Sequence, residues 1–344
     1  FCLGGNPVLS WPDQARTEAA LRKLELLVAL DYQMTATARH AHYVIPPPLS
    51  LELPGSTNFV EALKYNGVSR GFDVPWAQYT PAVLEAPAGS TVLDDREFFF
   101  RMAQRLGLQL EWTNIRGFGP HLERPKESIP FDMARVPGND ELIELMCRDS
   151  RVPLAEVRRH PHGHVFDEID VVVQPRDAGC TARLQLADPL MLRELDAVLH
   201  EAPDLASTGG RAYPYALVCR RSNNFMNSVG QTLPVLSGGA PRNPLFMHSA
   251  DLQGLGLEDG APVQVQSAHG EIAALVSPDD SLRPGVVAMY HGFGAGAAAS
   301  GSAAGSAVTR LVGMDEFDPI TGIPRMSAIP VRVARQPQAR PDNP

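Results

Sequence analysis

The strongest constraint on the fold lies between residues 243 and 287, where short apolar segments alternate with turns closed by glycine. The segment runs from Asn243-Pro244-Leu245 through Asp259-Gly260 to Arg283-Pro284-Gly285. Apolar residues that alternate with period two predict half-buried strands, and Gly and Pro mark the turns between them. The order predicts one short helix and three strands, and the same spacing of short segments from Tyr213 onward predicts a closed β-barrel.

Residues 1–47 predict a different, α/β kind of architecture. Apolar residues in a short run suit a buried parallel strand, and the turns between such runs carry Gly, Pro or Asp. Strand, helix and strand in this order are typical of a Rossmann-like half. The expected elements are a strand ending at Leu3, a turn at Gly4-Gly5-Asn6-Pro7, a helix over Asp13 to Lys23 with Asp13 as N-cap, a strand over Leu24 to Leu30, a short helix over Thr35 to Ala41, and a strand over Tyr43 to Pro46.

The middle of the chain is rich in loops and predicts two helices. Asp94 to Leu106 has a continuous apolar face and is followed by Gly107, which predicts its end. A second helix is expected over Asp140 to Met146. The predicted domains are residues 1–112, the C-terminal part of a Rossmann-like domain, 113–209, a mixed connector, 210–335, the barrel, and 336–344, a disordered tail.

Composition excludes several classes of function. The formal net charge is −9 and no long basic run is present, so nothing in the chain favours nucleic acid as a partner. No apolar stretch reaches the roughly 20 residues that span a bilayer. Cys2, Cys147, Cys180 and Cys219 form no CxxC pair, so neither a zinc site nor an iron–sulfur cluster is predicted within this chain. No signal peptide is evident, and a chain that opens on Phe1 suggests a fragment.

The first candidate binding residues lie at the ends of the N-terminal strands. Gly4, Gly5, Asn6 and Pro7 follow the first predicted strand, where glycines let a ligand approach the backbone. Asp31 follows the next strand, at the sheet edge where α/β proteins bind ligands, and its carboxylate could hold ribose hydroxyls or a guanine edge. An ordinary tight turn and a helix N-cap remain the alternative explanations.

A second group of candidates lies in the barrel half. Arg221, Asn227 and Ser228 stand on a polar loop after a predicted strand, where arginine would suit a phosphate. His291 opens a glycine-rich loop, His291-Gly292-Phe293-Gly294. A solvated turn and a structural glycine loop are the alternatives.

Three histidines alternate at His160, His162 and His164 and could suggest a metal clip. Pro161 and Gly163 between them favour a solvated loop instead, so no metal site is predicted.

The order of these segments resembles the molybdopterin oxidoreductases of the dimethyl sulfoxide reductase family. The family carries a segment like GGNP…DLLVVQDxFxTxTAxxADVVLP, then HGWG and DPxSGxP…PVRV. The chain departs from the family at three places. His40-Ala41-His42 stands where the family usually has a small residue and Asp, and the acidic residue expected after the proline appears only at Glu52. Residues 305–311 lack both amide side chains of the family's GxNVNxL. The matching segments here are Gly4–Pro7, Leu26–Ala38, Tyr43–Pro46, His291–Gly294, Asp318–Arg325 and Ile329–Val333.

The resemblance implies a partial Rossmann-like domain followed by a six-stranded double-psi β-barrel. It also implies that the chain contacts a molybdopterin guanine dinucleotide that carries molybdenum or tungsten. The protein ligand of the metal, and any iron–sulfur cluster, would lie in domains upstream of Phe1. The implied cofactor-binding residues are Gly4, Gly5, Asn6, Pro7, Asp31, Thr35, Arg221, Asn227, Ser228, His291 and Arg325.

The function expected from this resemblance is two-electron or oxo-transfer chemistry in a parent enzyme, with the 344-residue chain inactive alone. Its expected partners are the upstream domains and an electron-transfer subunit, without nucleic acid or insertion into a membrane. Cytoplasmic and periplasmic locations are both compatible with it. A stand-alone module that carries the cofactor, and a barrel with only a structural role, are the alternatives.

Overall fold

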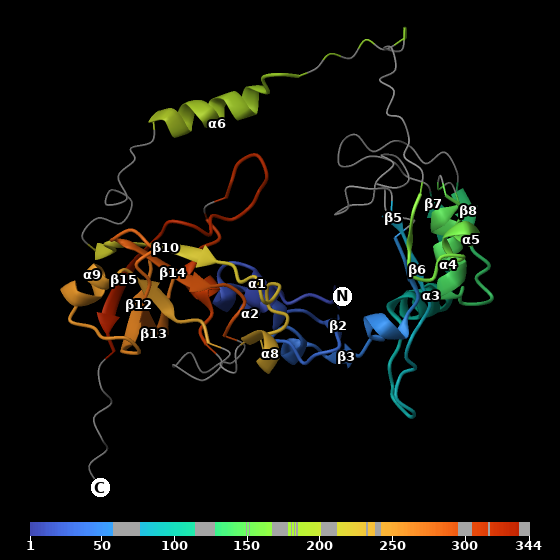
Figure 1. Cartoon of the computed structure of the whole chain (residues 1–344), viewed down its shortest axis with the longest axis horizontal. Coiled ribbons are helices and arrows are strands. Elements are labelled where there is room, and N and C mark those ends of the chain that lie inside the picture. The colour runs from blue at the N-terminus through green and yellow to red at the C-terminus, as the bar shows by residue number, and fades with distance from the viewer. Residues whose placement is uncertain are drawn as a thin grey trace. The chain divides into compact units, whose positions relative to one another are not determined.

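The computed structural model describes residues 1–57, 76–113, 128–148, 150, 152–166, 178–179, 181, 183, 185–200, 212–231, 233–237, 242–294, 305–315 and 317–336. The chain forms two compact units. Unit 1 combines residues 1–44 with residues 182–344, and unit 2 consists of residues 45–181. Figure 1 labels the helices and strands of both units.

The N-terminal part of unit 1 contains short parallel strands and short helices. Cys2 pairs with Ala29 and Leu3 with Leu30, so the first two strands run parallel, as expected for a Rossmann-like half. The sheet order is β1-β2-β3. The elements are β1 (Cys2–Leu3), α1 (Pro7–Ser10), α2 (Gln14–Leu21), β2 (Val28–Leu30), the 3-10 helix η1 (Ala38–His40) and β3 (Tyr43–Ile45), whose last residue belongs to unit 2.

Two predictions for this part need correction and one is confirmed. Asp13 caps α2, since its Oδ1 accepts a hydrogen bond of 3.0 Å from the Arg16 amide. The strand predicted from Leu24 begins only at Val28, because Leu24 and Leu26 are 44% and 53% exposed. An apolar run does not reveal which of its members is buried. The helix predicted over 35–41 is a single 3-10 turn, η1.

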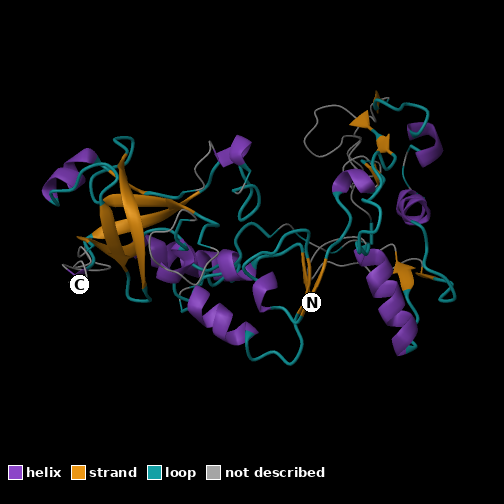
Figure 2. Cartoon of the chain, turned by 90° about the horizontal axis from the view of Figure 1, so that it is seen from below, coloured by secondary structure: helices purple, strands orange, loops and turns teal. Residues whose placement is uncertain are grey.

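The remaining part of unit 1 is a closed barrel, as predicted. Its strand order is β10-β14-β11-β13-β12-β15, with parallel pairs β10–β14 and β11–β13 among antiparallel ones. The strands of this barrel cross one another in Figure 2. The elements are α6 (Pro189–His200), β10 (Tyr215–Arg220), α8 (Pro234–Ser237), β11 (Leu245–Met247), α9 (Ser249–Gly254), β12 (Pro262–Gln266), β13 (Glu271–Pro278), β14 (Val286–Tyr290), the 3-10 helix η6 (Val308–Leu311) and β15 (Ile329–Arg335).

Alternation along the strands builds the barrel core. In β12, Val263 and Val265 are fully buried, whereas Pro262, the first residue of the strand, is exposed. Leu217 of β10 and Met289 of β14 are also fully buried, and they belong to one continuous core cluster. Side chains that point alternately inward and outward therefore fill the barrel and leave its loops to carry polar groups.

Unit 2 consists of short helices and two-stranded ladders. The helix predicted over Asp94 to Leu106 is confirmed as α3, with Asp94 as N-cap and Gly107 in the left-handed conformation at φ 66°. The helix predicted over Asp140 to Met146 is α4. The elements are the 3-10 helix η2 (Ser50–Glu52), β4 (Gly55–Ser56), β5 (Trp76–Ala77), β6 (Tyr79–Thr80), α3 (Asp95–Leu106), β7 (Glu111–Thr113), β8 (Ser128–Pro130), α4 (Asn139–Cys147), α5 (Leu154–Val157) and β9 (His164–Val165).

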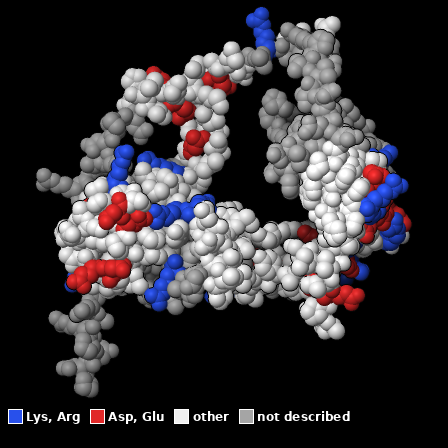
Figure 3. All heavy atoms as spheres, viewed as in Figure 1, with Lys and Arg blue, Asp and Glu red and all other residues white. Residues whose placement is uncertain are grey.

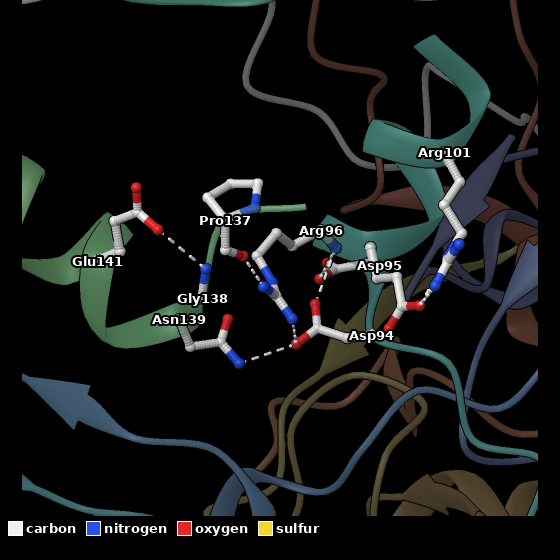
Figure 4. Close-up of polar contacts among 9 residues, drawn as sticks. Asp94, Asp95, Arg96, Arg101, Pro137, Gly138, Asn139 and Glu141 are labelled. Carbon is white, nitrogen blue, oxygen red and sulfur yellow. Dashed lines mark hydrogen bonds and ion pairs between the residues drawn. The ribbon is translucent and has the colours of Figure 1, made fainter. Parts of the chain in front are cut away.

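A polar network joins the beginnings of α3 and α4 in unit 2 (Figure 4). Asn139 donates a hydrogen bond of 3.0 Å to Asp94 Oδ2, and the Arg96 guanidinium bonds both Asp94 and the Pro137 carbonyl. Burial of the Asp94 carboxyl alone would raise its pKa, but the Asn139 hydrogen bond and the Arg96 charge outweigh it, so the pKa is lowered. The network therefore holds an ionised, buried N-cap.

Further expectations concern membrane spans, cysteines and domain boundaries. Among the described helices, none is long and apolar enough to cross a membrane. Cys2, Cys147 and Cys219 form no disulfide within the described part of the chain. Cys180 and the predicted tail from residue 337 lie outside the described residues. The predicted domain boundaries at 112, 209 and 335 stay predictions.

Candidate functional site

Three segments of unit 1 that are distant in sequence meet beside the barrel. We name them the N-terminal turn (residues 4–7), the arginine loop (residues 221–231) and the glycine loop (residues 291–294). The Asn6 amide donates a hydrogen bond of 3.1 Å to Ser228 Oγ and so joins the first two. Eight of the predicted binding residues lie on these segments.

The N-terminal turn is held by its own backbone and by Thr37. Gly4 adopts the left-handed conformation at φ 51°, and its amide donates to the Leu30 carbonyl at 2.9 Å. Asn6 Oδ1 accepts hydrogen bonds from the amide and the hydroxyl of Thr37, which is fully buried. Most of the hydrogen-bonding capacity of Asn6 is therefore used inside the chain, which makes it a joint between segments.

Asp31 and Thr35 lie next to this turn, after the carboxyl end of β2. Asp31 is only 7% exposed, and its Oδ1 accepts a hydrogen bond of 3.0 Å from the Gln33 amide. Thr35 Oγ1 accepts a hydrogen bond of 3.1 Å from the Ala38 amide at the start of η1. The structure thus places both at the edge of the sheet where the sequence predicts them.

Side-chain hydrogen bonds hold the arginine loop closed. Arg221 donates to Asn227 Oδ1, and Asn227 takes the left-handed conformation at φ 51° that asparagine tolerates. Gln231 is 7% exposed, and its Nε2 donates to the carbonyls of Asn227 at 2.7 Å and Gly292 at 2.8 Å. Gln231 therefore connects the arginine loop to the glycine loop.

Arg220, at the base of the arginine loop, packs among aromatic rings instead of facing solvent. Its guanidinium lies 4.6 Å from the centroid of the Phe246 ring and 5.9 Å from that of Tyr290. It also donates to Asp279 Oδ2 at 2.7 Å. The pKa of Asp279 is lowered, first by its hydrogen bond from Ser281 and then by Arg220. This ion pair fixes the end of β10, from which the loop departs.

His291 is buried at the start of the glycine loop. The residue is 5% exposed, its amide donates to the Arg220 carbonyl at 3.0 Å, and its ring Nδ1 has no hydrogen-bond partner. Burial, and secondly the charge of Arg221, lower its pKa to about 4. The imidazole is therefore neutral at pH 7 and presents a buried polar atom that a ligand could satisfy.

Close backbone approach explains the glycines of this loop. Gly292 has φ 90°, and a Cβ there would lie 2.1 Å from the Asn227 carbonyl oxygen. Gly294 also has φ 90°, and a Cβ there would lie 2.3 Å from the Ala307 amide nitrogen. These glycines thus let the loop pack against neighbouring chain, and a side chain at either position would push the segments apart.

A further set of contacts joins α2 to η6 below the loops. The Gln14 side chain is buried, and it accepts a hydrogen bond from Arg310 and donates to the Gly294 carbonyl at 3.5 Å. The Asp13 amide donates to the Val312 carbonyl at 2.8 Å. The N-terminal segment and the barrel are thereby one packed unit around the three segments.

The remaining candidates make contacts of their own. Arg325 is not part of the contacts above, and its Nε donates to the Ser327 carbonyl at 3.3 Å. In unit 2, His160 and His164 stack with ring centroids 4.1 Å apart. Across the described part of the chain, no three His, Cys, Asp or Glu side chains are grouped so as to hold a metal ion.

A cavity of about 300 Å³ opens on another part of the barrel. It contains none of the predicted binding residues. Arg242 and Asp259 supply its charged groups, and β13 forms much of its wall. It is therefore a competing location for a ligand, which the experiments below distinguish from the loops.

Sequence reasoning missed three residues that organise the site. Thr37, Arg220 and Gln231 make contacts with residues that lie 31, 59 and 61 positions away along the chain. No local pattern marks such a residue. The only signal for Arg220 was its place beside Arg221 at the end of a predicted strand.

Comparisons with known proteins relate this chain to molybdopterin enzymes. The family model described as molydopterin dinucleotide binding domain matches residues 215–330, which include the arginine and glycine loops. A dimethyl sulfoxide/trimethylamine N-oxide reductase of Cereibacter sphaeroides is 24% identical over 313 residues, and the match covers 85% of this chain and 35% of the relative. An acetylene hydratase of Syntrophotalea acetylenica is 25% identical over 306 residues, and the match covers 85% of this chain and 36% of the relative.

One solved structure shares the fold of nearly the whole chain. Acetylene hydratase from Pelobacter acetylenicus superimposes with a TM-score of 0.69 at 20% identity, covering 97% of this chain and 43% of that one. The chain spans about a third of the length of the curated relatives it matches.

Proposed function

We propose that this chain, which belongs to the dimethyl sulfoxide reductase family of molybdopterin oxidoreductases, holds the dinucleotide end of a molybdopterin-type cofactor between the three segments of unit 1. The form of the cofactor that we propose is the guanine dinucleotide, with molybdenum or tungsten as the metal. When bound, it supplies two-electron or oxo-transfer chemistry, and this chain supplies binding and orientation.

The observation that carries the proposal is the buried, unpartnered Nδ1 of His291. A buried polar atom without a partner costs about 1–3 kcal/mol, so such atoms are rare in folded proteins unless a ligand or water completes them. Here it lies on the glycine loop, which Gln231 ties to the loop carrying Arg221. The donor chemistry at this place fits a polar heterocycle joined to a diphosphate.

Each segment has a distinct proposed task. The Arg221 guanidinium would pair with the diphosphate, because a fixed fork of donors matches phosphate oxygens. The Asp31 carboxylate would accept hydrogen bonds from ribose hydroxyls or from a guanine edge. Asn6 and Ser228 would hold the N-terminal turn and the arginine loop at a constant separation, and Thr35, Asn227 and Arg325 remain proposed contacts.

The finer fold assignment is also part of the proposal. The parallel pair β1–β2, which ends at Asp31, supports a partial Rossmann-like domain. A closed barrel that mixes parallel and antiparallel neighbours supports the double-psi topology. The proposed domain limits are those given by the sequence, with the barrel over residues 210–335.

The activity of the whole protein is proposed from its relatives. Both a reductase and a hydratase are among them, so the family alone sets no single substrate. We propose an oxidoreductase whose further domains pack against this chain, with an electron-transfer subunit as a second partner. Large apolar side chains on unit 1, such as Trp11 at 57% and Tyr43 at 66% exposure, support packing against further protein.

Isothermal titration calorimetry of the 344-residue chain with guanosine diphosphate measures the nucleotide affinity and tests the binding claim. We expect binding, a preference for guanosine over cytidine diphosphate, and a loss of about tenfold or more in affinity for Arg221→Ala and Asp31→Ala. Arg242→Ala is the matched control, because Arg242 lines the separate cavity.

The outcomes separate the alternatives. Loss of affinity in the Arg242 variant alone would place the nucleotide in the cavity and overturn the assignment to the loops. Absence of binding by the folded chain would favour a barrel with only a structural role. A stand-alone cofactor carrier is not favoured by the relatives, which are reductases, dehydrogenases and a hydratase.

A further inference from the structure

Gln231 is the buried side chain that makes direct hydrogen bonds to both loops of the proposed site. Its Nε2 donates to the Asn227 carbonyl at 2.7 Å and to the Gly292 carbonyl at 2.8 Å. Both partners are backbone groups at special positions, since Asn227 has φ 51° and Gly292 has φ 90°. One amide group therefore satisfies the turn of the arginine loop and the turn of the glycine loop together.

The two turns pack closely against each other. A Cβ at Gly292 would lie 2.1 Å from the Asn227 carbonyl and 3.0 Å from Gln231 Nε2. The two backbones are thus in direct contact where Gln231 bridges them. Without the bridge, the Asn227 and Gly292 carbonyls would both lose this donor, and the loss at the buried Gly292 carbonyl favours separation of the loops.

The other contacts hold the loops at different points. Arg220 fixes the base of the arginine loop through Asp279, and Phe225 packs against Phe293 with centroids 5.5 Å apart. Ser228 meets the N-terminal turn through Asn6. The Arg221 hydrogen bond to Asn227 Oδ1 and the mutual backbone hydrogen bonds of Met226 and Val229 hold the turn of the arginine loop itself. The Gln231 amide joins that turn to the Gly292 carbonyl.

We propose that Gln231 is a positioning residue that latches the arginine loop over His291 and so presets the separation of Arg221 and His291 for the cofactor. The inference rests on the proposed function for its biological meaning, but the latch itself is a property of the chain alone. Closed loops bind a ligand without the cost of ordering them, so loss of the latch should weaken binding without removing any group that touches the ligand.

The latch can be detected through the pKa of His291, which a substitution at a purely structural residue would not change. His291 has a pKa lowered to about 4 because it is buried and because Arg221 is near. Opening of the arginine loop would hydrate the ring and move Arg221 away. The pKa of His291 would then rise toward its ordinary value of 6.5.

The experiment is an NMR titration of the histidine rings in the 344-residue chain, with the His291 signal assigned by its loss in His291→Gln. The latch variants are Gln231→Met and Gln231→Leu, which are both neutral and so add no charge near the ring. The matched control is Gln253→Met on α9, whose side chain is exposed. Binding of guanosine diphosphate is measured on the same samples.

We expect the His291 pKa to rise by a unit or more in a latch variant that melts within a few degrees of the native chain, and the nucleotide affinity to fall about tenfold, the scale of the two lost hydrogen bonds. The control should change neither. An unchanged His291 pKa in both folded latch variants would overturn the latch, even where nucleotide binding stands. A raised pKa without any nucleotide binding in the native chain would support the latch and overturn the proposed function.

Discussion

The two units of the chain are stabilised in different ways. All six strands of the barrel contribute to one continuous cluster of buried side chains, among them Leu217, Leu245 and Met289. Unit 2 contains two small clusters, centred on Val157 and on Ile143, within its described residues. Apolar burial therefore dominates unit 1, while unit 2 depends more on polar contacts.

Charged side chains take a larger part in unit 2. Arg158 bonds Glu144 and Asp140, and Arg135 bonds Glu141 at 2.6 Å. In Figure 3 the acidic and basic side chains alternate on the visible surface around α4 and α5. The buried network of Asp94, shown in Figure 4, adds the polar joint between α3 and α4.

This difference in packing between the units indicates which of them can hold a binding site in a fixed geometry. A closed, densely packed barrel gives its loops a rigid base, so small groups such as the Gln231 amide decide how the loops lie. Exposed ion pairs hold their residues less tightly, because solvent and salt screen them. The candidate site accordingly lies on the unit with the continuous core.

The largest expected effect comes from the barrel core. Leu217→Ala should lower the free energy of unfolding of unit 1 by about 3–4 kcal/mol, because it leaves a cavity in a fully buried place. Amide hydrogen exchange should show faster opening across the barrel and little change in unit 2. Leu199→Ala on α6, where Leu199 is 73% exposed, is the control. Equal losses in both variants would show that burial in the core cluster adds nothing specific, and equal faster exchange in unit 2 would remove the contrast between the units.

The next effect is a pH dependence in unit 1. The pKa of His291 is lowered to about 4 in the folded chain, so the unfolded chain binds a proton more readily between about pH 6.5 and 4. Stability is therefore complete above pH 6.5 and falls by up to about 3 kcal/mol as the pH drops to 4. His291→Gln should remove this part of the slope, as measured by urea unfolding at several pH values. His200→Gln, on exposed α6, should leave it unchanged, and an identical slope in all three proteins would contradict the account.

A smaller effect is expected at the polar joint of unit 2. Asp94→Ala removes the N-cap of α3 and the partner of Arg96 and Asn139, so unit 2 should lose about 1–2 kcal/mol. Because the pKa of Asp94 is lowered, its contribution is present above the ordinary carboxyl pKa and disappears as the pH falls through the folded value. Asp95→Ala changes the exposed neighbour and is the control. A result in which Asp95→Ala costs as much would show that the network adds nothing specific.

The smallest effect is expected for the exposed ion pairs. Arg135→Gln should leave the unfolding midpoint of unit 2 almost unchanged in 0.5 M salt, since about that concentration already screens surface pairs. At low salt a slight decrease is expected. A large decrease that persists at high salt would mean that these pairs carry more of the stability of unit 2 than their exposure suggests.

Local signals in the sequence were sufficient for some elements. Asp94 and Gly107 mark the two ends of α3 because a side-chain cap and a left-handed glycine act on the residues next to them. The alternation of apolar and polar residues around Val263 and Val265 is also a local signal, and it predicts a strand of the barrel. The strand predicted from Leu24 was too long, because an apolar run carries no information on which of its side chains a distant segment will cover.

The candidate site was only partly predictable. Asp31 could be placed because strand ends share one edge of a parallel sheet, and His291 could be placed by its glycine-rich loop. The role of Asn6 as a joint depends on Thr37 and on Ser228, which lies 222 positions away. Gln231 could not be singled out, since its partners are backbone carbonyls that leave no mark in the sequence.

Hydrogen–deuterium exchange of the 344-residue chain, with and without guanosine diphosphate, tests the central claim most directly. The account predicts protection in residues 4–7, 221–231 and 291–294, with unit 2 unchanged. Protection confined to the strands around the cavity at Arg242, or to unit 2, would contradict it. Exchange that the nucleotide leaves unaltered throughout the folded chain would contradict it as well.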